Sequence, residues 1–335
     1  MQVLRVDPES PEPRLIAQAA EVLRAGGLVA FPTETVYGLG AHALDPRAVE
    51  RIFRAKDRPA FNPLIAHLSG IAGARELASE WPPEAEQLAA AFWPGPLTLV
   101  LPKKPHVPDL LTAGLPAVGI RVPAHPVALA LITAAGVPIA APSANRFTEL
   151  SPTTATHVMK SLGDRVDVLL DGGPTMVGIE STVVDLTGAV PQLLRPGVLS
   201  AHQLSEVIGR PVVRGGEPVG AAPRHSPGMV ERHYAPKAEL RVLDPAALAQ
   251  SAAENSPAAA SDTGALLLHP LAVGADHVIR MPTDPAGYAR QLYAALHSLD
   301  DAGCRLILVE KVPDSEQWIA VQDRLRRAAH ERPNS

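Results

Sequence analysis

Short apolar runs alternate with longer amphipathic segments through residues 1–208, and this alternation predicts an α/β fold. The strand-like runs fall at residues 28–31, 64–68, 97–101, 118–122, 137–141, 168–170 and 182–186. Helical segments fit around them at 12–25, 45–56, 83–92, 125–135, 153–162 and 201–208. Because some spacings between strands are too short for a helical crossover, we expect a twisted mixed sheet with helices.

A stretch rich in glycine and proline, residues 209–236, interrupts the alternation and has no periodicity of its own. A second alternation follows, with strands expected at 240–243, 265–269, 277–280 and 305–309 and helices at 245–253, 284–299 and 315–330. This pattern is typical of a small Rossmann-like parallel sheet covered by helices. We therefore predict a first domain at 1–208, a linker at 209–236 and a smaller α/β domain at 237–335.

Charge and composition argue against several classes of protein. The net charge is −5 and neither half of the chain is basic, whereas proteins that grip a nucleic-acid backbone cluster Lys and Arg. Aromatic residues make up only 4% of the chain, which leaves few platforms for base stacking, so we expect no stable nucleic-acid binding. The first residues lack the layout of a signal peptide and no apolar run approaches about 18 residues, so we expect a cytoplasmic protein without membrane contact.

Several common catalytic motifs are missing from the sequence. It has no G-x-x-x-x-G-K-[ST] loop and no strand followed by G-x-G-x-x-G, so a bound nucleotide would need another cradle. The single cysteine, Cys304, cannot form a disulfide within the chain or a cysteine-ligated zinc site. His225 and His233 lie eight residues apart, which is not a metal-ligand spacing, and we name no metal ligand.

Lys56 stands out because of the helix that is expected to carry it. Asp45-Pro46 is a favourable helix start, and apolar residues at 49, 52 and 53 form an inward stripe. Lys56 lies four residues after Ile52 on that stripe, where an ammonium group requires a partner or a cleft. We expect it to point into a pocket for anions, with Arg58 at the helix end and Asn62 just beyond. The alternative is a solvated basic face, since arginines at 51, 54 and 58 share one side of the helix.

Further polar residues lie beside expected strands. Arg121 projects, with Gly119, from the face opposite to the apolar residues of 118–122, which suits a carboxylate or a phosphate. A salt bridge at the rim of the sheet is the alternative for this arginine. Ser143 and Asn145 follow the strand at 137–141, where small residues would let a ligand approach the backbone. A turn followed by a helix N-cap is the alternative for this segment.

Two other segments complete the set of candidates. Residues 31–40 follow a buried strand and are expected to open a loop dense with hydroxyls, although an ordinary strand exit would look similar. Glu180-Ser181-Thr182 opens a strand, and Leu194-Arg195-Pro196-Gly197 closes one. Such positive or donor-bearing side chains at strand edges suit an anionic nucleotide together with a small carboxylate.

The ordered set of motifs resembles the long, two-domain form of the L-threonylcarbamoyladenylate synthases of the YrdC-like family. The motifs that carry the resemblance are P-T-E-T-V-Y-G-L-G at 32–40, K-D-R-P at 56–59 with N-P-L at 62–64 and His67, W-P-G-P-L-T at 93–98, R-V-P at 121–123, P-S-A-N at 142–145, S-P-T at 151–153, E-S-T at 180–182, R-P-G at 195–197, and P-G-M and H-Y-A-P at 227–229 and 233–236. They span nearly the whole chain. The resemblance implies a YrdC-like first domain, with a Rossmann-like second domain, and no motif position departs from the family pattern.

The resemblance also implies a reaction and a set of roles. L-Threonine, bicarbonate and ATP would give threonylcarbamoyl-AMP and pyrophosphate, which serve the threonylcarbamoyladenosine modification of tRNA. The residues implied for L-threonine are Thr35, His67, Arg121, the backbone at Ala141, and Ser181. The residues implied for ATP are Lys56, Arg58, Asn62, Ser143, Asn145, Ser151, Arg195 and Tyr234, of which Lys56, Arg58, Ser143 and Asn145 form the catalytic set.

Elementary chemistry agrees with these roles. Carbamate formation and attack on the α-phosphorus need positioning and charge neutralisation, and Mg²⁺ bound mainly through the phosphates would share that work. His67 is expected to hydrogen-bond the substrate rather than act as a base. We expect the linker to fold over the site as a lid that excludes water, and the tRNA-modifying threonylcarbamoyl transferase to be the partner.

Two other functions stay open on the sequence alone. YrdC-like domains can be concave RNA-binding modules, although the acidic charge and scarce aromatics disfavour this. Fused YrdC-like domains also transfer a carbamoyl group in metalloenzyme maturation, but the zinc-binding cysteines that accompany them are missing here.

Overall fold

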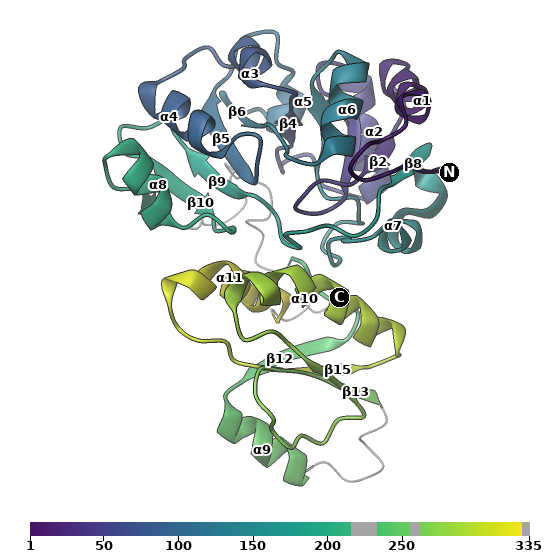
Figure 1. Cartoon of the computed structure of the whole chain (residues 1–335), viewed down its shortest axis with the longest axis vertical. Coiled ribbons are helices and arrows are strands. Elements are labelled where there is room, and N and C mark those ends of the chain that lie inside the picture. The colour runs from purple at the N-terminus through teal and green to yellow at the C-terminus, as the bar shows by residue number, and fades with distance from the viewer. Residues whose placement is uncertain (216–232, 255–261, 330–335) are drawn as a thin grey trace. The chain divides into compact units, whose positions relative to one another are not determined.

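The computed structural model describes residues 1–215, 233–254 and 262–329 (Figure 1). The chain divides into two compact units, Met1–Phe147 with Ser151–Met229, and Thr148–Leu150 with Val230–Ser335. Most of the predicted linker, residues 216–232, lies outside the described residues, so the limits of the linker stay a prediction.

The first unit is built on one mixed sheet with the strand order β1-β8-β2-β3-β7-β4-β6-β5-β9-β10-β11. Its strands are β1 Gln2–Arg5, β2 Val29–Phe31, β3 Gly38–His42, β4 Ile65–His67, β5 Leu97–Pro102, β6 Ala117–Arg121, β7 Ile139–Ala140, β8 Val168–Asp171, β9 Thr182–Asp185, β10 Gln192–Arg195 and β11 Val213–Arg214. Its helices are α1 Pro13–Arg24, α2 Pro46–Lys56, α3 Ile71–Leu77, α4 Pro83–Phe92, α5 Asp109–Thr112, α6 Pro126–Ala135, α7 Ala155–Leu162 and α8 Ala201–Ile208, with a 3-10 turn at Gly163–Arg165. The predicted mixed sheet with helices is confirmed.

Helix α2 shows why the sequence folds as it does at the site. The Asp45 side chain accepts a hydrogen bond from the Arg47 N–H at 2.9 Å, and Pro46 occupies the first turn, where its missing N–H has no cost. The stripe that includes Val49 and Ile52 is buried. The helix ends at Asp57, whose φ of 51° is left-handed, so the backbone turns sharply after Lys56.

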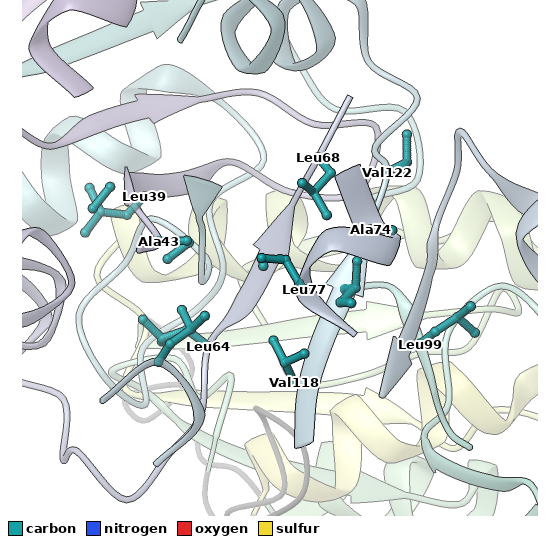
Figure 2. Close-up of a cluster of buried hydrophobic side chains, with 14 of the residues drawn as sticks. Leu39, Ala43, Leu64, Leu68, Ala74, Leu77, Leu99, Val118 and Val122 are labelled. Atoms are coloured by element: carbon teal, nitrogen blue, oxygen red, sulfur yellow. The ribbon is translucent and has the colours of Figure 1, made fainter. Parts of the chain in front are cut away.

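Two apolar layers cover the sheet unequally. One layer includes Leu64, Leu99, Val118 and Ile120 and packs against helices on one face, as Figure 2 shows around several of these side chains. On the other face, α1 and α6 cover the end of the sheet formed by β1, β8, β2 and β7. Side chains along a strand point alternately to the two faces of the sheet. On β4, β5 and β6, every second residue belongs to the first layer, and the residues between them point to the second face. This part of the second face is not covered by α1 and α6.

The segment 31–40 corrects one expectation. It was expected to open a loop, but Gly38–His42 forms β3, which pairs antiparallel with β2. The two glycines conceal the strand in the sequence, because glycine normally weakens a strand. Gly40 is required here because a Cβ at this position would lie 2.8 Å from Cε1 of Phe31. Strands β1 and β11 and helices α3 and α5 were also not predicted, since they are short or weakly patterned.

The second unit is a four-stranded sheet with the order β12-β15-β13-β14, in which all pairs are parallel. Its elements are β12 Glu239–Leu243, α9 Pro245–Glu254, β13 Thr263–Leu267, β14 His277–Arg280, α10 Pro285–Asp301, β15 Leu306–Glu310, a 3-10 turn at Glu316–Trp318 and α11 Ile319–Ala328. Helices α10 and α11 lie on one side of this sheet and α9 on the other (Figure 1). The predicted Rossmann-like parallel sheet is confirmed. Within the described ranges, no helix has both the length and the apolar character needed to cross a membrane.

Gly40→Ala tests the close packing of β3. The added methyl group would meet Phe31 at 2.8 Å, Ile139 at 3.0 Å and the backbone oxygen of Val29 at 3.1 Å. We expect the free energy of unfolding to fall by about 2 kcal/mol, measured by denaturant titration. Gly188→Ala is the control, because its Cβ would meet only one atom, at 4.0 Å, and we expect a change within about 0.5 kcal/mol. Equal losses in both variants would contradict the packing argument.

Candidate active site

Polar side chains gather on the face of the first sheet that α1 and α6 leave uncovered; we call this group, His67, Thr98, Arg121, Ser181 and Arg195, the polar face. His67 on β4 is the register partner of Arg121 on β6, so these two predicted residues lie side by side. Arg195 on β10 pairs with Val183 on β9, and alternation places Ser181 on the same side as Val183. All five side chains are buried.

Arg121 is held by two oxygen atoms. Its Nη2 donates to Oε1 of Glu34 at 2.7 Å, and its Nε donates to the carbonyl oxygen of Gly95 at 3.3 Å. The ion-paired side chains of Arg121 and Glu34 are 5% and 12% exposed, so the alternative of a salt bridge at the rim of the sheet does not apply. The sequence suggested an arginine suited to a carboxylate, and the carboxylate beside it comes from the protein itself.

His67 is a neutral imidazole. Burial, followed by the positive charges of Arg121 and Arg195, lowers the pKa of His67 to about 3. Nδ1 lies 3.2 Å from the carbonyl oxygen of Ile65, and the backbone of Ile139 also hydrogen-bonds the ring. In a neutral ring one nitrogen carries the hydrogen and the other can accept a hydrogen bond.

Ser181 and Arg195 form a second contact group on the polar face. The Ser181 hydroxyl lies 2.8 Å from that of Thr98 and accepts from Nη2 of Arg195 at 3.0 Å. Nε of Arg195 donates to the Ser181 carbonyl, also at 3.0 Å. The predicted residues Ser181 and Arg195 are thus brought together, and they share a hydrogen-bond network with Thr98.

Lys56 joins the two motifs that come from distant parts of the sequence. Its side chain is buried, and Nζ donates to the carbonyl oxygens of Ser143, at 2.6 Å, and of Asn145. The Phe147 N–H donates to the Lys56 carbonyl at 2.9 Å, which adds a backbone contact. The inward direction expected for Lys56 is therefore observed, and its ammonium lies against the loop that carries Ser143 and Asn145.

An apolar pocket continues the polar face along the strands. Its lining includes Pro63, Ile65, Thr98, Gly119 and Val183. Ile65, Gly119 and Val183 stand two positions from His67, Arg121 and Ser181 respectively. Because side chains alternate along a strand, these lining positions lie on the same face as the polar face. The pocket and the polar face therefore form one continuous surface.

Asn62 immediately precedes this pocket. Its side chain is fully buried, and neither the oxygen nor the nitrogen of its amide has a hydrogen-bond partner among the described residues. Arg58 borders the same region, since its Nη2 donates to the Pro63 carbonyl at 3.2 Å and its guanidinium lies 5.8 Å from the ring centre of Phe147. A buried amide without partners is costly unless a ligand or a water molecule supplies them.

The remaining predicted residues of the first unit, Thr35, Ala141 and Ser151, lie in segments between strands. The Thr35 hydroxyl is 2.8 Å from that of Thr33, and Ser151 donates to Oε1 of Glu180 at 2.5 Å. The Ala141 N–H donates to the Ile65 carbonyl at 3.0 Å, which places this backbone beside β4. All three belong to the first unit.

Tyr234 belongs to the second unit, unlike the other predicted site residues. Its ring centre lies 4.1 Å from that of His233 and 5.1 Å from the guanidinium carbon of Arg324. The P-G-M motif and His225 lie outside the described residues. The lid role of the linker stays a prediction.

Two residues of the site were not predicted. Glu34 stands between Thr33 and Thr35 in the P-T-E-T motif, and all three side chains are buried. An acidic residue within a segment of hydroxyl side chains was the feature of the sequence that could have indicated a polar contact. Thr98 interrupts the apolar run of β5, which signals a polar contact on the second face of the sheet. In the described parts of the chain, no group of three or more His, Cys, Asp or Glu residues could hold a metal ion.

Comparisons with known proteins match both units. A family model for Sua5, YciO and YrdC proteins, described as telomere recombination, matches residues 21–197. A model described as the threonylcarbamoyl-AMP synthase C-terminal domain matches residues 199–330. The threonylcarbamoyl-AMP synthase of Pyrococcus abyssi is 46% identical over 318 residues and covers 93% of each chain. The chain belongs to the threonylcarbamoyl-AMP synthase family.

Other relatives agree with this assignment. The threonylcarbamoyl-AMP synthase of Bacillus subtilis is 43% identical, over 94% of this chain and 92% of its own. A crystal structure of P. abyssi Sua5 complexed with L-threonine superimposes with a TM-score of 0.91, at 43% identity and over 98% of each chain. The protein is therefore an enzyme that makes threonylcarbamoyl-AMP, and neither the RNA-binding nor the carbamoyl-transfer alternative is favoured.

The low pKa of His67 predicts an acid-sensitive fold. The unfolded chain binds a proton near the ordinary pKa of about 6.5, whereas the folded chain resists protonation until about 3, so stability falls as the pH drops through this window. We expect His67 alone to cost about 2 kcal/mol of unfolding free energy between pH 7.5 and 5, and His67→Gln to remove this part.

Urea titration at both pH values measures the difference. His202→Gln, at an exposed position on α8, is the control and should keep the pH dependence of the unsubstituted enzyme. The account of His67 fails if His67→Gln loses as much stability on acidification as the unsubstituted enzyme.

Proposed function

We propose that the polar face and the adjoining Lys56 region bind L-threonine, bicarbonate and ATP and form threonylcarbamoyl-AMP and pyrophosphate for the threonylcarbamoyladenosine modification of tRNA. The observation that carries the proposal is that a buried arginine, Arg121, stands beside a neutral histidine, His67, on one sheet face. A guanidinium suits a carboxylate, and a neutral imidazole can accept a hydrogen bond beside it without adding charge. This pair therefore fits an amino acid.

The amino-acid subsite is proposed to comprise Thr35, His67, Arg121, the backbone at Ala141, and Ser181. Arg121 would bind the carboxylate of threonine through N–H groups that Glu34 and Gly95 do not use. The L-threonine complex of P. abyssi Sua5 supports an amino-acid site in a relative of 43% identity.

The nucleotide subsite is proposed to comprise Lys56, Arg58, Asn62, Ser143, Asn145, Ser151 and Arg195, with Tyr234 from the linker. We assign the adenine base to the apolar surface that includes Pro63 and Gly119. The amide of Asn62, which has no hydrogen-bond partner among the described residues, would match the donor and acceptor on the edge of adenine, as asparagine does in other contacts with this base. Arg58 and Arg195 would then face the phosphates.

The proposed reaction has two steps. The amine nitrogen of threonine attacks the carbon of bicarbonate, the leaving hydroxyl takes the amine proton, and water departs. A carbamate oxygen then attacks the α-phosphorus while its bond to pyrophosphate breaks. Lys56, Arg58, Ser143 and Asn145 would hold the nucleotide in line and offset the charge that develops, and Mg²⁺ bound through the phosphates would add to this.

The remaining roles stay predictions. They are the lid function of the linker, delivery of the product to the tRNA-modifying threonylcarbamoyl transferase, and location in the cytoplasm. The limits of the two domains and the linker, at 1–208, 209–236 and 237–335, are likewise proposed.

Pyrophosphate release tests the reaction directly. We expect release from ATP only when both L-threonine and bicarbonate are present. Lys56→Ala and Arg121→Ala should each lower the rate by about 100-fold or more, since each removes a buried charge at the reacting groups. Arg75→Ala, at an exposed salt bridge with Glu86, is the control. Release of pyrophosphate without threonine, or undiminished rates in both variants, would contradict the proposal.

Asn62→Leu separates binding from stability. In the free enzyme the substitution removes two buried polar atoms that have no partner in the described part of the chain, so we expect equal or higher thermal stability. ATP affinity should nevertheless fall about tenfold, because the contact to the nucleotide is lost, while L-threonine affinity stays unchanged. Calorimetric titration and thermal unfolding of the same samples measure both. Unchanged ATP affinity would remove Asn62 from the nucleotide subsite.

A further inference from the structure

The carboxylate of Glu34 is fixed at both of its oxygens. Oε1 accepts from Nη2 of Arg121 at 2.7 Å, and Oε2 accepts from the backbone N–H of Ala124 at 3.1 Å. The Glu34 carbonyl also accepts from the N–H of Val177 at 2.7 Å, which anchors its backbone. The side chain therefore bridges the segment after β2 and the segment after β6, and leaves little freedom to the arginine that it holds.

The two contacts of Arg121 determine which of its donors stay available. A guanidinium has five N–H groups. Nη2 donates one to Glu34 and Nε donates its only one to Gly95, so the plane of the guanidinium is fixed. The N–H groups left over are the two of Nη1 and one of Nη2, and these can donate to the carboxylate of a substrate.

Charge gives Glu34 a second effect. Arg121 is the register partner of His67, and the positive charge of Arg195 also acts on this imidazole by lowering its pKa. Without Glu34 the polar face would carry two adjacent positive charges and would attract phosphate and other multiply charged anions. With Glu34 the Arg121 region is electrically neutral, which favours a zwitterion, whose own charges cancel, over a polyanion.

We propose that Glu34 is a positioning residue: it orients Arg121 for the carboxylate of the amino-acid substrate and keeps phosphate groups out of the amino-acid subsite. The proposal rests on the function proposed above. It adds the residue that makes the amino-acid subsite differ in charge from the nucleotide subsite. Arg121 touches the substrate, and Glu34 acts through Arg121.

Direct binding measurements test this role without requiring turnover. L-Threonine is titrated calorimetrically into the full-length enzyme and into the variants Glu34→Gln and Glu34→Ala, with and without inorganic phosphate. Glu86→Gln is the matched control, because Glu86 also pairs with an arginine, at 2.5 Å, but in an exposed position. Thermal unfolding of each variant checks that it is folded.

The expected pattern differs from that of general damage. Glu34→Ala should weaken L-threonine binding about tenfold or more, and Glu34→Gln, which can still accept from Arg121, should weaken it less. In Glu34→Gln the inhibition of threonine binding by phosphate should become about threefold to tenfold stronger, because the positive charge is uncompensated. A structural defect would weaken the binding of both ligands, and Glu86→Gln should change neither.

The outcomes distinguish the two proposals. If the unsubstituted enzyme does not bind L-threonine, the proposed function fails and the role of Glu34 fails with it. If the enzyme binds threonine but Glu34→Gln shows unchanged threonine affinity and unchanged phosphate inhibition, only the role of Glu34 is overturned. Should Glu34→Ala not fold, Glu34→Gln, which has nearly the same shape, decides the question.

Discussion

The burial of positive charge constrains the first unit more than any other interaction. Lys56, Arg58, Arg121 and Arg195 are each at most 7% exposed, and a cation in such a place without partners would cost several kcal/mol. Each is held by oxygen atoms of the protein. For Lys56, Arg121 and Arg195 these come from segments distant in the sequence, so the contacts that make the charges tolerable also fix the loops that form the site. Stability and site geometry therefore have a common origin.

This arrangement explains how donors that are oriented in advance can promote the proposed reaction. Charge that develops on the phosphates and on the carbamate meets donors that are already oriented, so little reorganisation is needed when the reaction occurs. The neutral region around Glu34 and Arg121 and the cationic region around Lys56 and Arg58 differ in charge although they belong to one surface. In the proposed mechanism, that difference assigns a zwitterion to one region and a polyphosphate to the other.

The sequence predicted most of the fold because buried strands leave a strong pattern. Runs such as 97–101 and 118–122 became β5 and β6 almost unchanged, whereas β3 was not predicted because Gly38 and Gly40 look like loop residues. For the site, helical spacing predicted the direction of Lys56 and alternation predicted the face of Arg121. Neither rule can identify a partner from another segment of the chain. The pairing of Arg121 with Glu34 could therefore be found only from the structure.

The pKa of His67 limits where the proton of threonine can go. An imidazole whose pKa is about 3 is too weak a base to remove a proton from an ammonium group. In the proposed mechanism threonine therefore binds as a zwitterion and then loses its ammonium proton to solvent or to the bound anions. The second proton needs no base, because the hydroxyl of bicarbonate carries it away as water. Exclusion of water after binding would then protect the product without hindering the chemistry, which is the physical reason for expecting a lid over this site.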